Sequence, residues 1–329
     1  MKMGNRIALI IAVILTLSAS LPAIAVERNI EKSFDVIPGG TLKLDTDIGT
    51  VEISSHPDNT VQVQATLVAH TSSDSRAEDI FDNYKLTFDS SKSDVIIKGD
   101  FVDNWLWRNN RLSVKFTITV PERYNISVAT SGGNIDVGDI KGQVNLKTSG
   151  GRINLGNING VIDARTSGGG IKVEDVTGNT RVYTSGGNIR IGTVKGDLDA
   201  RTSGGGIDVD GVEGNLVART SGGSLHLLNV SGELSGDTSG GPIVAELMKQ
   251  VTGRLELRTS GGSIKLSVPA DFRADLNAST SGGHVYTDVP ISVQGKISNS
   301  SLSGKINGGG PEVVLRTSGG SIEITTNVH

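Results

Sequence analysis

One repeated tetrapeptide constrains the fold of this chain more than any other feature of its sequence. Thr-Ser-Gly-Gly begins at Thr130 and recurs at intervals of 18 residues as far as Thr238, so that seven copies share one spacing. Three further copies begin at Thr259, Thr280 and Thr317. Constant short periods of this kind are typical of solenoids, in which each repeat forms one coil that stacks on its neighbours.

Apolar and polar residues alternate between one copy and the next. In the coil that follows Gly133, the apolar residues are Ile135, Val137, Ile140, Val144 and Leu146. Alternation with a period of two predicts strands with one buried face, and stretches of about five residues bounded by glycine are too short for helices. A single coil cannot bury its own apolar face. We therefore expect parallel strands stacked in register about 4.8 Å apart, with the repeated threonine facing inward at a corner and its hydroxyl bonded to neighbouring coils.

These patterns predict an all-β chain, namely a single-stranded parallel β-solenoid of 18-residue coils with an N-terminal β-rich cap. The apolar positions of a coil recur with a period of nine residues, which favours two main strands per coil over a left-handed hexapeptide helix. Parallel crossovers are usually right-handed, so we expect a right-handed β-helix. We also expect the corner glycines to provide positive φ values. A calcium-binding roll is disfavoured, because isoleucines such as Ile135 and Ile153 occupy the positions where such rolls require glycine.

The chain divides into three predicted regions: residues 1–25 as a signal peptide, residues 26–129 as the cap, and residues 130–329 as the solenoid. The cap is expected to contain one short helix over residues 75–84, with Asp74 or Ser75 as its N-cap. Residues 51–53 resemble a degenerate coil. Residues 289–311 interrupt the repeat with proline and three consecutive glycines, which indicates an insertion before the last coil.

The first residues indicate export. Lys2 and Arg6 accompany an apolar stretch over residues 7–15, and Ala23-Ile24-Ala25 forms an A-x-A cleavage site. A membrane span would need roughly 20 apolar residues, so the stretch is too short to serve as one. We expect cleavage after Ala25 and a mature chain that is periplasmic, at the cell surface or secreted, with no transmembrane segment. The sequence has no cysteine, which rules out disulfides and an anchor on a lipid-modified cysteine.

The repeated unit T-S-G-G-x-I-x-V-x-x-V-x-G-x-L resembles that of the bacterial β-strand-repeat proteins described as "putative adhesins" of unknown function. The segment FDVIPGGTLKL, residues 34–44, resembles the same group, and the resemblance covers essentially the whole mature chain. It implies a β-solenoid and a location in the cell envelope or at the surface. It implies no catalytic residues, because none is established in that group.

No motif points to catalysis, a cofactor or a metal. The net charge of −4 excludes a nucleic-acid binder that relies on bulk positive charge. A phosphate-binding loop is absent, and the five histidines are dispersed without the spacing of metal ligands. We therefore expect a non-catalytic adhesin, or a binding or structural module of the envelope. The alternative is a carbohydrate-active β-helix enzyme, a polysaccharide lyase or hydrolase, which a clustered acidic groove would favour.

One outward-facing column provides the candidate ligand surface. It consists of Lys147, Arg165, Tyr183, Arg201, Arg219 and Arg258, with Asp237 before the last. Adjacent like charges on paired strands are mildly destabilising. An anionic envelope polysaccharide or another envelope protein would offset that repulsion, because arginine binds phosphates and carboxylates bidentately. The alternative is that Asp163 and Asp199, on the same face, neutralise the column as solvated ion pairs.

Two further features bear on sugar chemistry. Asp163 and Asp199 lie two coils apart, close to the separation of about 5–9.5 Å that glycosidase carboxylates need. Arg181 lies between them in the sequence pattern and favours a structural charge ladder instead. Trp105 and Trp107 alternate in the cap, where they would stack on a sugar if exposed or pack inside the cap if buried.

Overall fold

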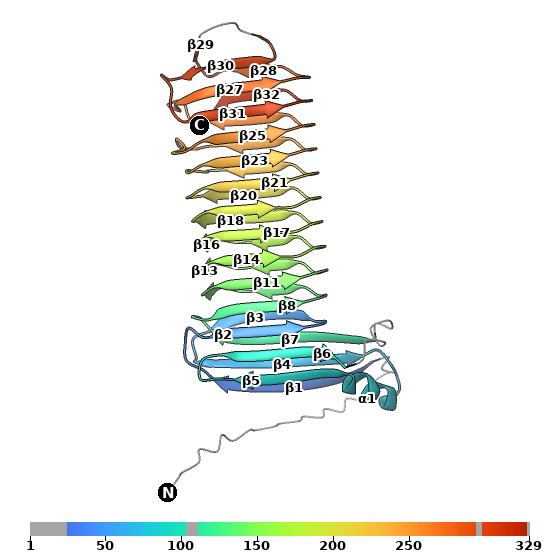
Figure 1. The fold of residues 1–329 in the computed structure, drawn as a ribbon. Coiled ribbons are helices and arrows are strands. Elements are labelled where there is room, and N and C mark those ends of the chain that lie inside the picture. Colours follow the sequence, from blue (N-terminus) through green and yellow to red (C-terminus); the bar gives the residue numbers. More distant parts are fainter. Residues whose placement is uncertain (1–24, 103–110, 294–297, 328–329) are drawn as a thin grey trace.

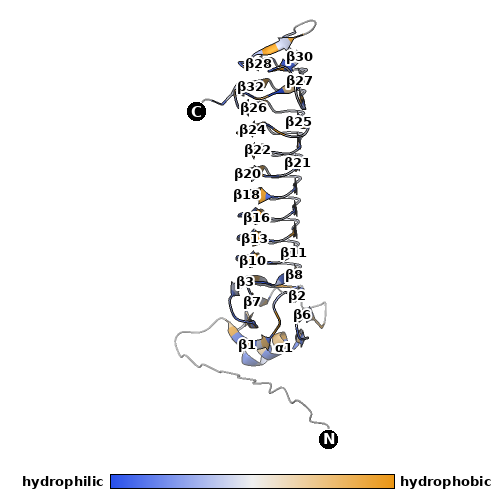
Figure 2. Cartoon of the chain, turned by 90° about the vertical axis from the view of Figure 1, so that its left-hand side faces the viewer, coloured by the Kyte–Doolittle hydropathy of each residue, from blue (hydrophilic) through white to orange (hydrophobic). Residues whose placement is uncertain are grey.

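The structure, a computed structural model, describes residues 25–102, 111–293 and 298–327. These residues form a long stack of strands with the N-terminal cap at one end (Figure 1). A view turned by 90° shows the strands in two facing layers (Figure 2). Within the described residues, the layers are sheet A, with 17 strands, and sheet B, with 15. The predicted architecture of long parallel sheets is therefore confirmed, whereas residues 1–24 of the predicted signal peptide, Trp105 and Trp107 lie outside these residues.

The elements alternate between the two sheets along most of the chain, and the helix α1 (Asp74–Asp82) belongs to the cap. Sheet A contains β1 (Val26–Asp35), β3 (Thr50–His56), β4 (Thr60–Ala69), β7 (Leu112–Pro121), β9 (Ile135–Val137), β10 (Ile140–Lys141), β12 (Ile153–Leu155), β13 (Ile158–Asn159), β15 (Ile171–Val173), β16 (Val176–Thr177), β18 (Ile189–Lys195), β20 (Ile207–Val212), β22 (Leu225–Leu228), β24 (Ile243–Glu246), β26 (Ile264–Val268), β28 (Val285–Thr287) and β32 (Ile322–Thr326). Sheet B contains β2 (Thr41–Thr46), β5 (Tyr84–Ser90), β6 (Val95–Phe101), β8 (Asn125–Thr130), β11 (Val144–Thr148), β14 (Ile162–Arg165), β17 (Thr180–Tyr183), β19 (Leu198–Arg201), β21 (Leu216–Thr220), β23 (Leu234–Thr238), β25 (Leu255–Thr259), β27 (Ala274–Thr280), β29 (Ile291–Val293), β30 (Ser301–Ile306) and β31 (Glu312–Thr317).

Aliphatic ladders fill the space between the sheets. In sheet A, Ile171 pairs in parallel with Ile153 on one side and with Ile189 on the other, and Ile189 pairs with Ile207. All four side chains are at most 2% exposed, as the alternation predicted. Burying a side chain of this size contributes about 1.5–3 kcal/mol, so the stability of the stack is distributed over many equivalent contacts between neighbouring coils.

The repeated threonine closes the corner between sheet B and sheet A. The Thr166 hydroxyl donates to the carbonyl of Gly151, the second glycine of the preceding corner, at 2.8 Å. The Thr148 hydroxyl in turn accepts from the Gly151 N–H at 3.4 Å. The same donation recurs from Thr148 to Thr317, and the repeated threonines are buried. The predicted threonine ladder is confirmed.

The second glycine of each corner is required for a different reason from the one expected. Only Gly133 among the corner glycines has φ in the left-handed range, at 121°, so the expectation of positive φ is wrong for the others. A Cβ on Gly151 would lie 1.8 Å from the carbonyl oxygen of Gly133. Consecutive corners thus approach so closely that the neighbouring backbone occupies the space of a side chain. The first glycine is less restricted, since a Cβ on Gly150 meets nothing within 4 Å.

Both ends of the stack contain a coil that is out of sequence order. At the N-terminal end, β2 lies between β6 and β8, and β3 lies between β7 and β9. At the other end, the last coil of the chain places β31 between β25 and β27, and β32 between β26 and β28. The residues predicted as an insertion contain β29 and β30. β30 pairs antiparallel with β27, and β29 pairs antiparallel with β30. The first and last coils of the sequence are therefore paired on both sides.

The cap combines antiparallel strands with one helix. β4 pairs antiparallel with β1 and β7, and β5 pairs antiparallel with β6. The helix begins one residue earlier than predicted, and its N-cap is Ser73, whose hydroxyl accepts from the Arg76 N–H, so the expected caps Asp74 and Ser75 are wrong. In the described part of the chain, no helix has the length and apolarity needed to cross a membrane. Because both sheets continue from the cap into the repeats, the division at residue 129 stays a prediction.

A buried tyrosine of the cap, Tyr124, makes the folded state less stable at alkaline pH. The Tyr124 side chain is fully buried, and its hydroxyl donates to the carbonyl of Ser93 at 2.5 Å. Burial, with a smaller contribution from the negative charge of Asp94, raises the pKa of Tyr124 to about 12. Burial also raises the pKa of Tyr84. The unfolded chain releases the Tyr124 proton near pH 10, before the folded chain does, so stability is complete below pH 10 and falls as the pH rises toward 12.

We expect Tyr124→Phe to reduce this dependence. At pH 8 the variant should be less stable by about 1 kcal/mol, because it loses one hydrogen bond. Between pH 8 and 11.5 the wild type should lose about 2 kcal/mol more than the variant, which has no proton to release at this site. Urea unfolding at pH 8, 10 and 11.5 measures the difference, which also cancels the contributions of other titrating groups. Parallel pH profiles of wild type and variant would contradict the assignment.

Candidate functional site

The predicted outward column lies on the solvent face of sheet B. Parallel register aligns its members from β11 to β25: Lys147 with Arg165, Arg165 with Tyr183, Tyr183 with Arg201, Arg201 with Arg219, Arg219 with Asp237, and Asp237 with Arg258. All seven side chains are exposed. Arg316 of β31 pairs with Arg258 and extends the column, and the sequence analysis missed it because the last coil stacks out of order.

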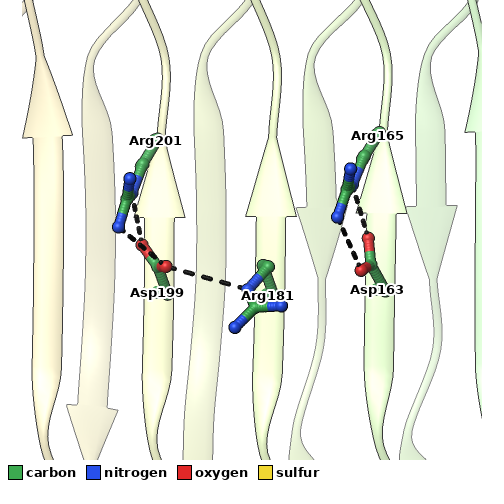
Figure 3. A network of polar contacts seen from close by, with 5 residues as sticks. All are labelled: Asp163, Arg165, Arg181, Asp199 and Arg201. Carbon is green, nitrogen blue, oxygen red and sulfur yellow. Dashed lines mark hydrogen bonds and ion pairs between the residues drawn. The ribbon is translucent and has the colours of Figure 1, made fainter.

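Carboxylates of the adjacent column neutralise several of these cations (Figure 3). Residues two apart on a strand share a face, so Asp163 forms a two-fold hydrogen-bonded pair with Arg165, at 2.8 and 2.9 Å. Asp199 binds Arg201 in the same way, at 2.7 and 3.0 Å, and lies 3.8 Å from Arg181 of the neighbouring strand. Hydrogen bonding to Asp163 raises the pKa of the Arg165 guanidinium.

The same pairing involves Asp163 and Asp199, the two carboxylates considered above for glycosidase chemistry. Arg258 also forms an ion pair within its strand, with Glu256. Asp163 and Asp199 are both engaged by arginines, so they form the structural charge ladder rather than an acid and a base facing a sugar. These pairs are solvated, and each contributes about 0–1 kcal/mol to stability.

Three cations of the column remain available. The side chains of Lys147, Arg219 and Arg316 make no hydrogen bond or ion pair in the described part of the chain, and they are separated along the column by other residues. Tyr183 is 41% exposed, and its hydroxyl lies 3.5 Å from the hydroxyl of Ser185. Within the described residues no arginine stacks on its ring.

The solvent face of sheet A carries a second feature, which we call the axial groove. Two hollows of about 580 and 460 Å³ share Lys172 and Glu174 and together extend from β3 to β24. The groove follows a bend in sheet A, where β9, β12 and β15 end before a second half-strand and where β18 and β20 continue through the same position. In three coils this position is a glycine without a side chain, Gly138, Gly156 or Gly192, and in four others it is Glu174, Asp210, Leu228 or Glu246. The outward residues were predicted from alternation, but the groove was missed because strand parity does not reveal a bend.

Carboxylates predominate along the axial groove. It is lined by six of them, Glu52, Asp136, Glu174, Asp208, Asp210 and Glu246, and by the cations Lys172 and Arg190. Lys172 pairs with Glu174 at 2.6 Å, and Arg190 and His226 approach Asp208 at 3.5 and 3.7 Å. Asp210 and Glu246 have no side-chain partner among the described residues. The groove therefore carries an excess of negative charge at its β20–β24 end.

An acidic groove is the feature that would favour the carbohydrate-active alternative, so its chemistry matters. A glycosidase needs a carboxyl group that burial keeps protonated, beside a second carboxylate. Glu174 and Asp210 are exposed, and Asp208 is half-buried beside Arg190 and His226. The described residues also contain no cluster of three metal-ligating side chains. The groove is suited to binding charge rather than to proton transfer.

Comparison with known proteins identifies the family. The family model described as Toastrack DUF4097 matches residues 41–325. No curated protein matches the chain. Three crystal structures are similar to it, and each alignment covers 91% of this chain. A "putative cell adhesion protein" from Clostridium sporogenes is 14% identical, is covered over 100% of its own chain and has a TM-score of 0.18. A "putative lipid binding protein" from Parabacteroides distasonis (11% identity, TM-score 0.34) and a "putative adhesin" from Bacteroides fragilis (12% identity, TM-score 0.25) are each covered over 97% of their own chains. These similarities are too distant to carry an argument. Because the family model covers well over half of its length, the chain belongs to the Toastrack DUF4097 family.

Proposed function

We propose that this protein is an exported, non-catalytic module of the bacterial cell envelope that acts as an adhesin or envelope binder. The observation that supports the proposal is the pair of long parallel sheets, whose outer faces present side chains in straight rows at one strand spacing of about 4.8 Å. Rows of this kind suit an extended polymer, since many weak contacts along one chain add up to useful affinity. The proposal includes cleavage after Ala25 and a right-handed path with 18-residue coils.

The ligand proposed for sheet B is an anionic envelope polymer. Its binding would depend on the three cations of the column that no carboxylate neutralises, Lys147, Arg219 and Arg316. The arginines that already bind a carboxylate, Arg165, Arg201 and Arg258, would contribute less, because a ligand has to displace their present partners. Affinity should fall as salt rises, since exposed charges are screened.

Two matched triple variants test this proposal. The first replaces the unpaired cations (Lys147→Gln, Arg219→Gln, Arg316→Gln), and the second replaces the paired ones (Arg165→Gln, Arg201→Gln, Arg258→Gln). Both remove three positive charges from one column. The chain starting at Val26 is applied to immobilised polyphosphate and polygalacturonate and eluted with salt. We expect the wild type to be retained, the unpaired-cation variant to elute at clearly lower salt, and the paired-cation variant to elute between them. Absence of wild-type retention, or equal elution of the two variants, would rule out this surface.

A further inference from the structure

The axial groove of sheet A consists of two hollows that meet at Lys172 and Glu174. Apart from Thr117 of β7, its lining comes from β3, β9, β12, β15, β18, β20, β22 and β24, which are consecutive parallel neighbours. At about 4.8 Å per strand, the groove extends over about 34 Å. An extended polypeptide advances about 3.3 Å per residue, so about ten residues would occupy it from end to end.

The charged side chains of the groove indicate the charge of the ligand that it would bind. The two cations of its lining are already paired, Lys172 with Glu174 and Arg190 with Asp208. Asp210 and Glu246 have no partner within the described residues, and the Asp136 carboxylate accepts only from the Asn154 amide, at 2.5 Å. Sheet B differs, because its carboxylates and arginines largely pair with one another. The groove therefore attracts cations, whereas the sheet B column carries unpaired positive charges on Lys147, Arg219 and Arg316.

The lining also disfavours sugars. No phenylalanine, tyrosine or tryptophan is among the residues that line either hollow, so a sugar ring would find no large apolar ring for stacking. A peptide needs no such surface, because its cationic side chains can pair with the carboxylates of Asp210 and Glu246 while its backbone passes over the glycines of the other coils.

We propose that the axial groove binds an extended segment of about ten residues, rich in lysine or arginine, from a partner protein or peptide. This proposal concerns the face opposite the cationic column and does not depend on the anionic polymer. Complementary charge gives the association its specificity and a rate that increases as salt is lowered.

Decalysine is the direct probe, with decaglutamate as the opposite charge and spermine as a short polyamine. Titration of labelled decalysine into the chain from Val26, followed by fluorescence anisotropy, should show saturable binding that weakens as salt increases. Decaglutamate should not displace decalysine from the groove, and spermine should bind at least tenfold more weakly because it reaches only part of the groove. Failure of decalysine to bind, or equal affinity for spermine, would overturn the proposal.

Two pairs of charge variants locate the binding site. Asp210→Asn with Glu246→Gln removes the unpaired carboxylates of the groove, and the Kd for decalysine should rise at least tenfold. Glu233→Gln with Asp237→Asn makes the same change of charge on sheet B, where both side chains are exposed. This control should change the Kd by less than twofold. Equal effects of the two pairs would show attraction to net charge alone and would contradict a groove site.

A steric variant completes the test without any change of charge. Gly138 lines the groove, its φ is outside the left-handed range, and a Cβ there would meet its nearest atom, the Ile53 carbonyl oxygen, at an ordinary 3.6 Å. Gly138→Leu should therefore fold and fill the β9 part of the groove, and we expect decalysine binding to weaken at least fivefold. Circular dichroism and thermal unfolding check that the fold is intact. Unchanged affinity in the folded variant would exclude the groove.

Discussion

Gly151→Ala should destabilise the solenoid by about 3 kcal/mol or more, although it adds a single methyl group. The new Cβ would lie 1.8 Å from the carbonyl oxygen and 2.3 Å from the carbonyl carbon of Gly133, and both atoms belong to backbone that cannot rotate away. The corner would have to open, which also strains the Thr148 and Thr166 hydroxyl contacts to the glycine carbonyls at this corner. Overpacking that moves backbone is among the few mechanisms with effects of this size.

The neighbouring glycine provides a matched control. Gly150→Ala makes the same chemical change one residue earlier, where a Cβ meets no atom within 4 Å. Because alanine restricts the unfolded chain more than glycine does, this control should be neutral or stabilise by about 0.5 kcal/mol. Denaturant unfolding followed by circular dichroism compares the variants, and hydrogen exchange at β11 and β14 shows whether the damage is local, as expected in a stack of repeats. Similar unfolding midpoints for the two variants would show that close approach does not explain the second glycine.

The regular part of the fold could be predicted from the sequence because its information is local. Alternation identifies which side of a strand is buried, and the constant spacing of Thr-Ser-Gly-Gly sets the register between coils. The reason for the second glycine could not be predicted, because the approach of two corners is a property of the stack. The order of the terminal coils was hidden for a related reason. Thr280 and Thr317 begin identical tetrapeptides, and nothing near them in the sequence indicates that Thr317 stacks next to Thr259.

The candidate site, like the fold, could be predicted from the sequence only in part. Parity correctly placed Arg165 and Arg201 in one exposed column, and it also placed Asp163 and Asp199 beside them. Whether a cation is paired depends on its own strand. Arg201 lies two residues after Asp199 on the same strand, whereas Arg219 lies two residues after Val217. Arg219 therefore has no carboxylate on its own strand, and the same is true of Lys147. The axial groove could not be predicted, because it arises from a bend repeated in many coils rather than from any single residue.

The largest loss of stability is expected for Ile189→Asp, in the middle of the buried isoleucine ladder. Ile189 is 0% exposed and lies between Ile171 and Ile207, so an aspartate there would have aliphatic neighbours on both sides and no cation to pair with. Loss of the apolar contacts and burial of an unpaired carboxylate should together cost about 4 kcal/mol or more.

Val161→Asp provides the control, because it replaces another β-branched aliphatic residue by aspartate where the side chain is 50% exposed. A solvated carboxylate costs little, and we expect a change within about 0.5 kcal/mol. The ladder also predicts where the damage should spread, and this prediction would not hold for a globular core. Each coil is stabilised by its two neighbours, so the defect at Ile189 should weaken two interfaces at once and raise hydrogen exchange in β15, β18 and β20 before it does so in β8 or β31. If Ile189→Asp unfolds at the same denaturant concentration as Val161→Asp, or if its exchange rises uniformly along the stack, neighbouring coils do not stabilise one another through this column.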